Sequence, residues 1–550
     1  MNSSRDLSST PPSPEFLIGH RMGFAVVAAD VAERIGLVDY VNTHVPWDAK
    51  QCKVSPGMRI LALVIAMMVD PLALYRLEEF YREVDCAVLF GAERQPEDFN
   101  DDAIGRALIK LFDSQVAVLY QGLSRQAVVR LALPDTETIH SDTTSITLYG
   151  AYADQQTGAV PTYGYNKDGH PECKQLVAGV VARADGIPLD VDVCDGNMDD
   201  PTWSRQAVLS HGLDLADDVR EQMLFVADSK LISHDTVTDL CDSGIRFVSR
   251  LPNTFGLEQT LKAAAAQDGT QWNAVGRLAA DRGGALYRVT ETSGELGGQT
   301  LRIVVVHSSA LEAKARHRAV VHQNQQAEQL DRAIARWNRR VFACEADAQA
   351  AWAAWQATKS VTHAVWTVEG TILEDTPSCW MIRAHRGDLR GAQVEVERFR
   401  RSTFLLVSND PRRSARELLE AYKTQFVVEQ DNALVKGPLA VAPLFLKDTR
   451  KITAYVYVVY MALLLWQCLQ AVMRQNQERL GFTLPYPNQA LQPAPTTNRL
   501  KQIVAPIQVI LWRDSEGRLR RNRSELTLVQ RQALLLAGTD SRRFTRIPSG

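Results

Sequence analysis

Residues 138–149 read TIHSDTTSITLY, a run dominated by β-branched residues. Such side chains suit the pleated surface of a sheet, so the run predicts a strand. Two apolar runs follow at 176–182 and 187–193, and Ala184-Asp185-Gly186 between them is a tight-turn signal. The sequence therefore predicts three strands in a meander.

Helical and strand patterns alternate after this meander. Helices are predicted over 201–215 and 235–242, and short apolar strands over 224–227 and 245–249. A meander followed by alternating helices and strands is typical of an α/β sheet. We assign residues 133–250 to the first part of an α/β core.

The region before this core has a different character. Residues 1–15 are polar and rich in Ser and Pro, which predicts a disordered leader without the apolar segment of a signal peptide. Residues 16–132 show helical periodicity, for example at 24–35 and 56–68. We expect an all-helical N-terminal domain.

After this first part of the core, the sequence predicts an insertion over 251–400 and a second part of the core over 401–475. A Pro-rich linker with a basic helical region is predicted over 476–550. Within the insertion, strand patterns alternate with two long helical stretches that suggest an antiparallel hairpin. The predicted strands are 285–290, 301–306, 363–373 and 393–396, the helices are 311–340 and 347–359, and the core resumes with a strand at 404–408.

The chain has 550 residues, with 61 Lys and Arg against 64 Asp and Glu, a net charge of −3. This balance excludes a polycationic DNA coat but permits an enzyme with a local basic surface. The tail 499–550 is such a region, with 11 Lys and Arg against 4 Asp and Glu. The eight cysteines form no CxxC pair, which argues against a zinc ribbon and fits a reducing, cytoplasmic location.

An uncharged run of 22 residues lies between Lys451 and Arg474. It is long enough to cross a bilayer, so a membrane anchor is one interpretation. Its glutamines and tyrosines, and the absence of a second such run, favour a buried helix of a soluble protein without a membrane partner.

Three acidic residues stand out by their context. Asp142 interrupts the β-branched strand, Asp228 follows the apolar strand 224–227, and Glu429 lies in a helix predicted over 417–436. The carboxyl ends of strands are where open α/β sheets place their sites. In a continuous helix, Glu429 would share one narrow stripe with three further polar residues, because the spacing repeats the helical turn. These residues are Tyr422, Gln425 and Lys436.

This pattern resembles the insertion-sequence transposases of the DDE type, which carry a Y-(2)-R-(3)-E-(6)-K signature. Tyr422, Glu429 and Lys436 match the signature, and Gln425 stands in place of its Arg. The contexts HSDTTSITLYG and FVADSKLIS also resemble those around the first and second acids of that family, and the resemblance runs from about residue 16 to 475.

The resemblance implies an RNase H-like mixed sheet, interrupted by the insertion, that cuts and joins DNA. Asp142, Asp228 and Glu429 would be the catalytic acids and the ligands of two Mg²⁺ ions, or of Mn²⁺, because hard cations bind carboxylate oxygens. Tyr422, Gln425 and Lys436 would contact DNA. The implied partners are double-stranded DNA, as terminal inverted repeats and target, and a second copy of the chain.

Several assignments stay open. His140 is either a neighbour of the site or a hydrogen-bonded core histidine. Asn197 and Asp199 are either neighbours of the site or parts of a capped loop before a helix. The arginines of the helical hairpin and the basic tail are either phosphate contacts or solvated surface. A metal-dependent nuclease on the same fold, and a degenerate DNA-binding derivative, are the alternative functions.

Overall fold

In the computed structural model of the chain, the stretch that begins at Thr138 forms strand β2 (Thr138–Leu148). β2 pairs antiparallel with β3 (Lys174–Arg183), and β3 pairs antiparallel with β4 (Pro188–Cys194). Gly186 in the connecting turn has a φ of +92°, a conformation that glycine adopts without strain. The predicted meander is confirmed, and β5 (Leu224–Ala227) follows β2 in the order β4-β3-β2-β5.

The structure describes residues 17–152, 157–267, 269–278, 284–362, 364–377, 379–439, 446–486, 494–514 and 516–548. The chain divides into two compact units: Met1–Val226 with Gln425–Gly550, and Ala227–Thr424. The leader predicted for 1–15 and part of the predicted Pro-rich linker lie outside the described residues.

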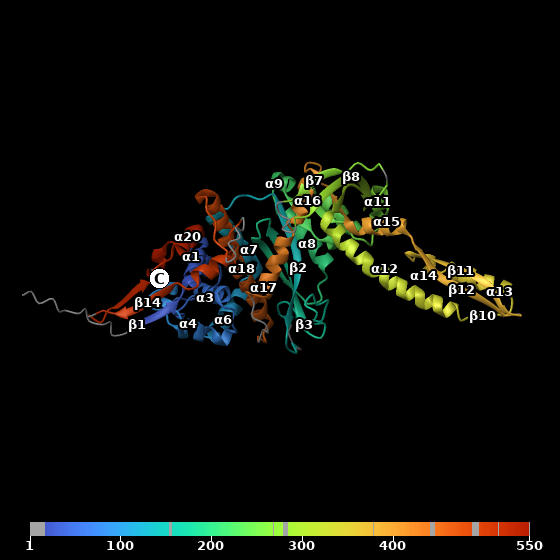
Figure 1. The fold of residues 1–550 in the computed structure, drawn as a ribbon. Helices are drawn as coiled ribbons and strands as arrows, with labels where there is room; N and C mark the ends of the chain where they lie inside the picture. The colour runs from blue at the N-terminus through green and yellow to red at the C-terminus, as the bar shows by residue number, and fades with distance from the viewer. Residues whose placement is uncertain are drawn as a thin grey trace, which may run out of the picture. The chain divides into compact units, whose positions relative to one another are not determined.

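The long apolar run forms α18 (Thr449–Leu480) in the first unit (Figure 1). It packs against α1 (Gly23–Ile35), α3 (Pro56–Val69), α6 (Asp101–Asp113) and α7 (Val116–Arg130). By length and hydropathy α18 could span a membrane, but 89% of its most apolar window is buried inside the protein. This packing agrees with the prediction of a buried core helix.

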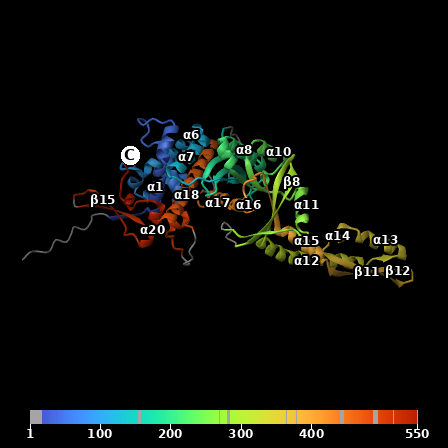
Figure 2. The same ribbon diagram turned by 90° about the horizontal axis from the view of Figure 1, so that it is seen from above.

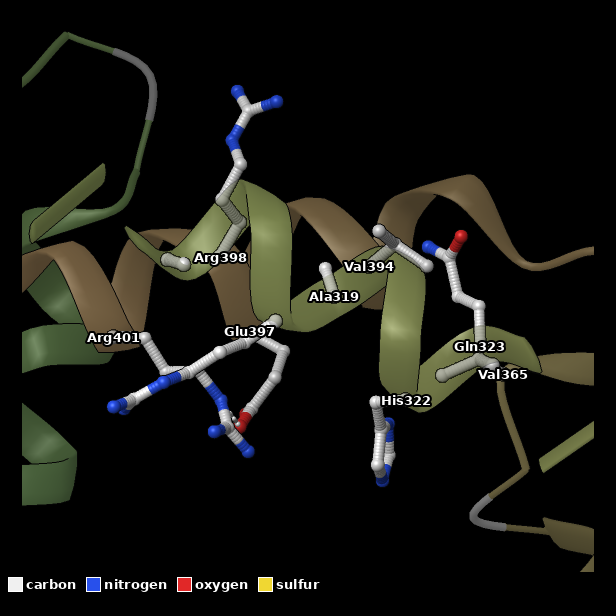
Figure 3. A pocket seen from close by; sticks show the side chains of 10 residues that line it. Ala319, His322, Gln323, Val365, Val394, Glu397, Arg398 and Arg401 are labelled. Atoms are coloured by element: carbon white, nitrogen blue, oxygen red, sulfur yellow. Dashed lines mark hydrogen bonds and ion pairs between the residues drawn. The ribbon is translucent and has the colours of Figure 1, made fainter. Parts of the chain in front are cut away.

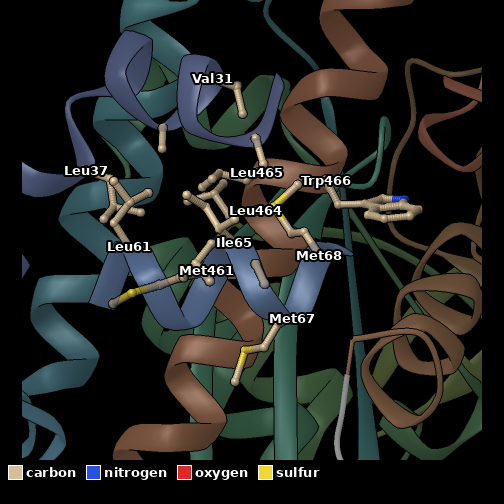
Figure 4. Packing of buried hydrophobic residues seen from close by; sticks show 14 of the residues in the cluster. Val31, Leu37, Leu61, Ile65, Met67, Met68, Met461, Leu464, Leu465 and Trp466 are labelled. Atoms are coloured by element: carbon tan, nitrogen blue, oxygen red, sulfur yellow. The ribbon is translucent and has the colours of Figure 1, made fainter. Parts of the chain in front are cut away.

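Figure 4 shows the centre of this core. Met461 and Leu464 of α18 lie beside Ile65 of α3, and all three side chains are fully buried. Burial of apolar surface on this scale is the dominant favourable contribution to folding. The remaining helices of the first unit are α2 (Leu37–His44), α4 (Leu77–Arg82), α5 (Cys86–Phe90), α8 (Asp200–Leu213), α9 (Asp217–Gln222), α17 (Phe426–Lys436), α19 (Thr497–Val504) and α20 (Leu528–Ala537).

Both ends of the described chain contain strands that the helical predictions missed. β1 (Leu17–Arg21) pairs antiparallel with β14 (Gln508–Arg513), and β14 pairs with β15 (Leu519–Arg523). The all-helical prediction for 16–132 is therefore wrong at its start, and that for the basic C-terminal region is wrong in its middle. β1 in particular depends on a partner far away in the sequence.

In the second unit, five strands are adjacent in the order β6-β13-β9-β8-β7. Its predicted strands at 245–249, 285–290, 301–306 and 404–408 are confirmed. The strands are β6 (Arg246–Arg250), β7 (Asn273–Arg277), β8 (Leu286–Leu296), β9 (Gln299–Ser308) and β13 (Thr403–Ser408), and the helices beside them are α10 (His234–Asp242), α11 (Gly256–Ala265) and α16 (Ala415–Lys423).

The predicted pair of long helices is present as α12 (Ser309–Trp337) and α13 (Glu345–Gln356), but it is not a simple hairpin (Figure 2). α12 packs mainly against α15 (Gly391–Ser402) and β12 (Cys379–Leu389), and α13 packs against β12 and its neighbour β11 (Trp366–Thr376). The strand predicted at 393–396 is wrong, because these residues belong to α15. The short elements β10 (Val341–Phe342) and α14 (Lys359–Thr362) complete this part.

Candidate active site

Asp142 lies in the middle of β2, on the face against which α17 packs. Its carboxylate is partly buried and accepts a hydrogen bond from Asn432 of α17, with 2.9 Å between Nδ2 and Oδ2. The next residue, Thr143, points to the opposite face, where its hydroxyl donates to Asp200 at the start of α8. Helices on both faces therefore fix the strand around Asp142.

Glu429 is an exposed residue in the first turn of α17. It precedes Asn432 by three positions, so the two side chains lie on one side of the helix, about 60° apart around its axis. Since Asn432 contacts Asp142, the helix presents Glu429 on the side that faces the strand with the first acid.

The helix predicted over 417–436 is interrupted. α16 ends at Lys423 and α17 begins at Phe426. At the break, the Thr424 hydroxyl donates to the carbonyl of Ala421, a local bond that competes with helix continuation. Tyr422 thus lies in α16, Gln425 at the N-cap of α17, and Glu429 and Lys436 within α17, so the prediction of one continuous helix is wrong.

The predicted DNA contacts have different surroundings. Tyr422, in the second unit, lies beside Phe404 with 6.0 Å between the ring centroids. Gln425 is buried, with 8% of its surface exposed, at the N-cap of α17. The Lys436 ammonium forms an ion pair with Asp168, and both side chains are about one quarter exposed. The DNA-binding role of these three residues stays a prediction.

Asp228 follows β5, as the sequence predicts, and belongs to the second unit. Its carboxylate caps a short 3₁₀ helix by accepting from the amide of Lys230 at 2.9 Å. Its carbonyl accepts from the hydroxyl of Ser249 in β6 at 2.7 Å. The backbone at this acid is thus fixed by the neighbouring strand.

Two of the open assignments near the acids, His140 and Asp199, have structural surroundings. His140 is fully buried, and burial lowers its pKa to about 4, so the ring is neutral near pH 7. Asp199 caps α8 by accepting from the amide of Thr202 at 3.0 Å. Asn197 is exposed.

Sequence reasoning missed Asn432 and the residue before it, Asp431. Asp431 is fully buried, accepts a hydrogen bond from Gln467 of α18, and has a pKa that burial raises well above its usual range. This hydrogen bond joins α17 to α18. The available signal was the spacing of three residues between Glu429 and Asn432, which places both on one helix face.

Among the described residues, no group of three His, Cys, Asp or Glu side chains is arranged to hold a metal ion. The donor chemistry nevertheless fits a hard divalent cation, because Asp142 and Glu429 offer carboxylate oxygens and Asn432 adds an amide. Asp228, which belongs to the second unit, offers a further carboxylate.

The basic residues of α12 and of the segment that follows it are partly engaged within the second unit. Arg316 pairs with Glu312 at 2.6 Å, and the Arg340 guanidinium lies 4.4 Å from the ring centroid of Trp337. A small pocket of about 30 Å³ lies between α12 and α15. Figure 3 shows Arg398 and Arg401 at its border. Phosphate binding by the arginines of the predicted hairpin stays a prediction.

Two family models match most of the chain. Residues 134–465 match the family model described as "Transposase DDE domain", and residues 20–125 match a "Domain of unknown function (DUF4277)". No curated protein matches the chain. Among solved structures, the chain is similar to a piggyBac transposase in a synaptic complex with hairpin DNA, with 9% identity, a TM-score of 0.36, and coverage of 86% of this chain and 80% of that one.

The family match spans Asp142, Asp228 and Glu429 and includes both units. It covers more than half of the chain. The chain therefore belongs to the transposase DDE domain family and is a DDE transposase, an enzyme of DNA transposition that cleaves DNA and transfers the cut strand.

Proposed function

We propose that Asp142, Asp228 and Glu429 are the three acids of this transposase and that they hold two Mg²⁺ ions, with Mn²⁺ as a substitute. The observation that carries the proposal is the hydrogen bond between Asn432 and Asp142, because it joins the helix that bears Glu429 to the strand that bears Asp142. The strand order β4-β3-β2-β5 supports an RNase H-like core.

Asp142 and Glu429 suit different roles in metal-dependent DNA cleavage. Bound divalent ions would supply an activated water or 3′-hydroxyl and stabilise the leaving oxygen. Asp142 is held by Asn432, so its carboxylate orientation is fixed before DNA binds. Glu429 is exposed, so bound ions and DNA would have access to its carboxylate.

The proposed substrate is an insertion sequence of the Y-R-E-K group, and the proposed DNA is its terminal inverted repeats and a target duplex. Lys436 and Tyr422 would contact phosphates, whereas the buried Gln425 would do so only after a local rearrangement. We also propose a homodimer, because two DNA ends must be joined. The proposed location is the cytoplasm. Light scattering with and without end DNA tests the dimer.

The test of the site is DNA cleavage by Asp142→Asn, Asp228→Asn and Glu429→Gln. Each variant should lose Mg²⁺-dependent cleavage by about a thousandfold or more, because the transition-state charge loses its metal ligand. Asp235→Asn, at an exposed position of α10, is the matched control and should cleave normally. An unchanged rate in any one of the three would remove that residue from the site.

A joining assay separates the transposase from the alternative nuclease. With a donor end and a target plasmid, the transposase should yield joined products in Mg²⁺. Nicks without joined products would favour the nuclease, and DNA binding without either product would favour the degenerate derivative.

A further inference from the structure

Two exposed tyrosine rings flank a glycine in the loop between β2 and β3. Tyr163 is 62% exposed and Tyr165 is 85% exposed, although aromatic rings of this size usually bury much of their surface. Both belong to the first unit. Side chains so exposed contribute little to the core and are available to a partner.

The backbone around Gly164 and Tyr165 is fixed. The Tyr165 carbonyl accepts from the Ser145 hydroxyl at 3.4 Å and from the Gln175 side-chain amide at 3.3 Å. A Cβ atom at Gly164 would lie 2.2 Å from the carbonyl oxygen of Gly196, so only glycine allows this close approach. The two rings therefore project from a rigid support.

The same loop lies beside the first proposed acid. The Lys167 ammonium donates to the carbonyl of Thr143, the residue after Asp142, at 2.7 Å, and it pairs with Asp200 at 3.1 Å. Asp168, the next residue, holds Lys436 at the end of α17. Short contacts thus connect the tyrosine-bearing loop to both elements of the proposed site in the first unit, β2 and α17.

We propose that Tyr163 and Tyr165 are a stacking platform for unpaired DNA bases next to the cleaved phosphodiester. The inference rests on the proposed function. Exposed aromatic rings on a rigid support bind bases through their π-faces, independently of sequence. Bases within an intact duplex already stack on one another, so the platform takes unpaired bases at an opened transposon end.

The test uses the full chain and a fluorescent 20-nucleotide single strand, with the corresponding blunt duplex as reference. The double variant Tyr163→Ala/Tyr165→Ala should bind the single strand about tenfold or more weakly, with a smaller change for the duplex. Tyr163→Phe/Tyr165→Phe should bind as the native chain does, because phenylalanine keeps the stacking face. Tyr75→Ala, which removes a 68% exposed ring elsewhere, is the matched control.

Native affinity in the double alanine variant would overturn the proposal. An equal loss in the phenylalanine variant would also overturn it, because the hydroxyl groups would then bind phosphate. Asp142→Asn separates this proposal from the proposed site: it should bind the single strand normally and fail to cleave. If Asp142→Asn cleaves while the alanine variant loses binding, the site assignment fails and the platform stands.

Discussion

Asn432 on α17 donates a hydrogen bond to Asp142 on β2, across 290 positions of sequence, with 2.9 Å between the two atoms. Asn432 is 8% exposed, so the bond is shielded from water. A neutral amide fixes the orientation of a carboxylate while leaving its negative charge intact. This pair therefore links the geometry of α17 to the first acid of the proposed site.

We expect Asn432→Ala to lower the rate of Mg²⁺-dependent cleavage by about ten- to a hundredfold and to raise the Mg²⁺ concentration needed for half-maximal rate, because groups that orient metal ligands have effects of this size. Asn432→Asp should instead shift the pH profile upward, because a second carboxylate raises the pKa of Asp142. Gln430→Ala, at an exposed position of the same helix, is the control. Native Mg²⁺ dependence in Asn432→Ala would show that the bond only stabilises the fold.

Lys436 offers a second test, through its ion pair with Asp168. If Lys436 contacts a DNA phosphate, Lys436→Met should weaken DNA binding and reduce the slope of log affinity against log salt by about one. Asp168→Asn should release Lys436 and strengthen binding at low salt, while stability changes by at most about 1 kcal/mol, since the pair is partly exposed. Lys50→Met, at an exposed position, is the control. Equal salt slopes for Lys436→Met and the native chain would limit Lys436 to the pair with Asp168.

Local pattern predicted the strands around Asp142 and Asp228, because β-branched runs and turn residues act over a few positions. The pairing of β1 with β14 was not predictable in this way, because its partners lie at opposite ends of the chain. The sequence QVEV at 393–396 alternates like a strand, yet packing against α12 and the i,i+4 ion pair of Arg401 with Glu397 favour helix α15.

In the candidate site, too, features set by local sequence were predictable and contacts between distant residues were not. The context of the three acids and the spacing of Tyr422, Glu429 and Lys436 could be read from sequence. The break at Thr424 could not, because its side chain bonds locally within a segment whose periodicity continues. The partners Asn432 and Asp168 could not either, because each joins a residue more than 260 positions away.

A substitution at Gly179 would test the packing of Trp203 against the sheet. A Cβ atom there would lie 2.0 Å from Cε2 of Trp203, whose ring is buried and whose Nε1 donates to Asp192 at 2.9 Å. Gly179→Ala should therefore displace the ring and lower stability by about 1–3 kcal/mol, seen as a lower midpoint of thermal unfolding. Gly256→Ala, where a Cβ meets no atom within 4 Å, is the control. A native midpoint in Gly179→Ala would contradict this packing.

The pH dependence of stability tests the burial of His140. Burial lowers the pKa of His140 to about 4 in the folded chain, against about 6.5 for an unfolded histidine. Below pH 6.5 the unfolded chain gains a proton that the folded chain does not bind, so the free energy of unfolding falls as the pH is lowered from 6.5 to about 4. The loss amounts to about 3 kcal/mol in total.

His140→Gln removes this contribution, so the stability of the variant should fall less steeply over that range. Comparison of the two slopes is needed because buried Asp431, whose pKa burial raises, contributes with the opposite sign in both proteins. His322→Gln, at an exposed position of α12, serves as the control. Parallel slopes for His140→Gln and the native chain, measured as thermal midpoints between pH 4 and 7, would show that His140 binds its proton equally in the folded and unfolded chains.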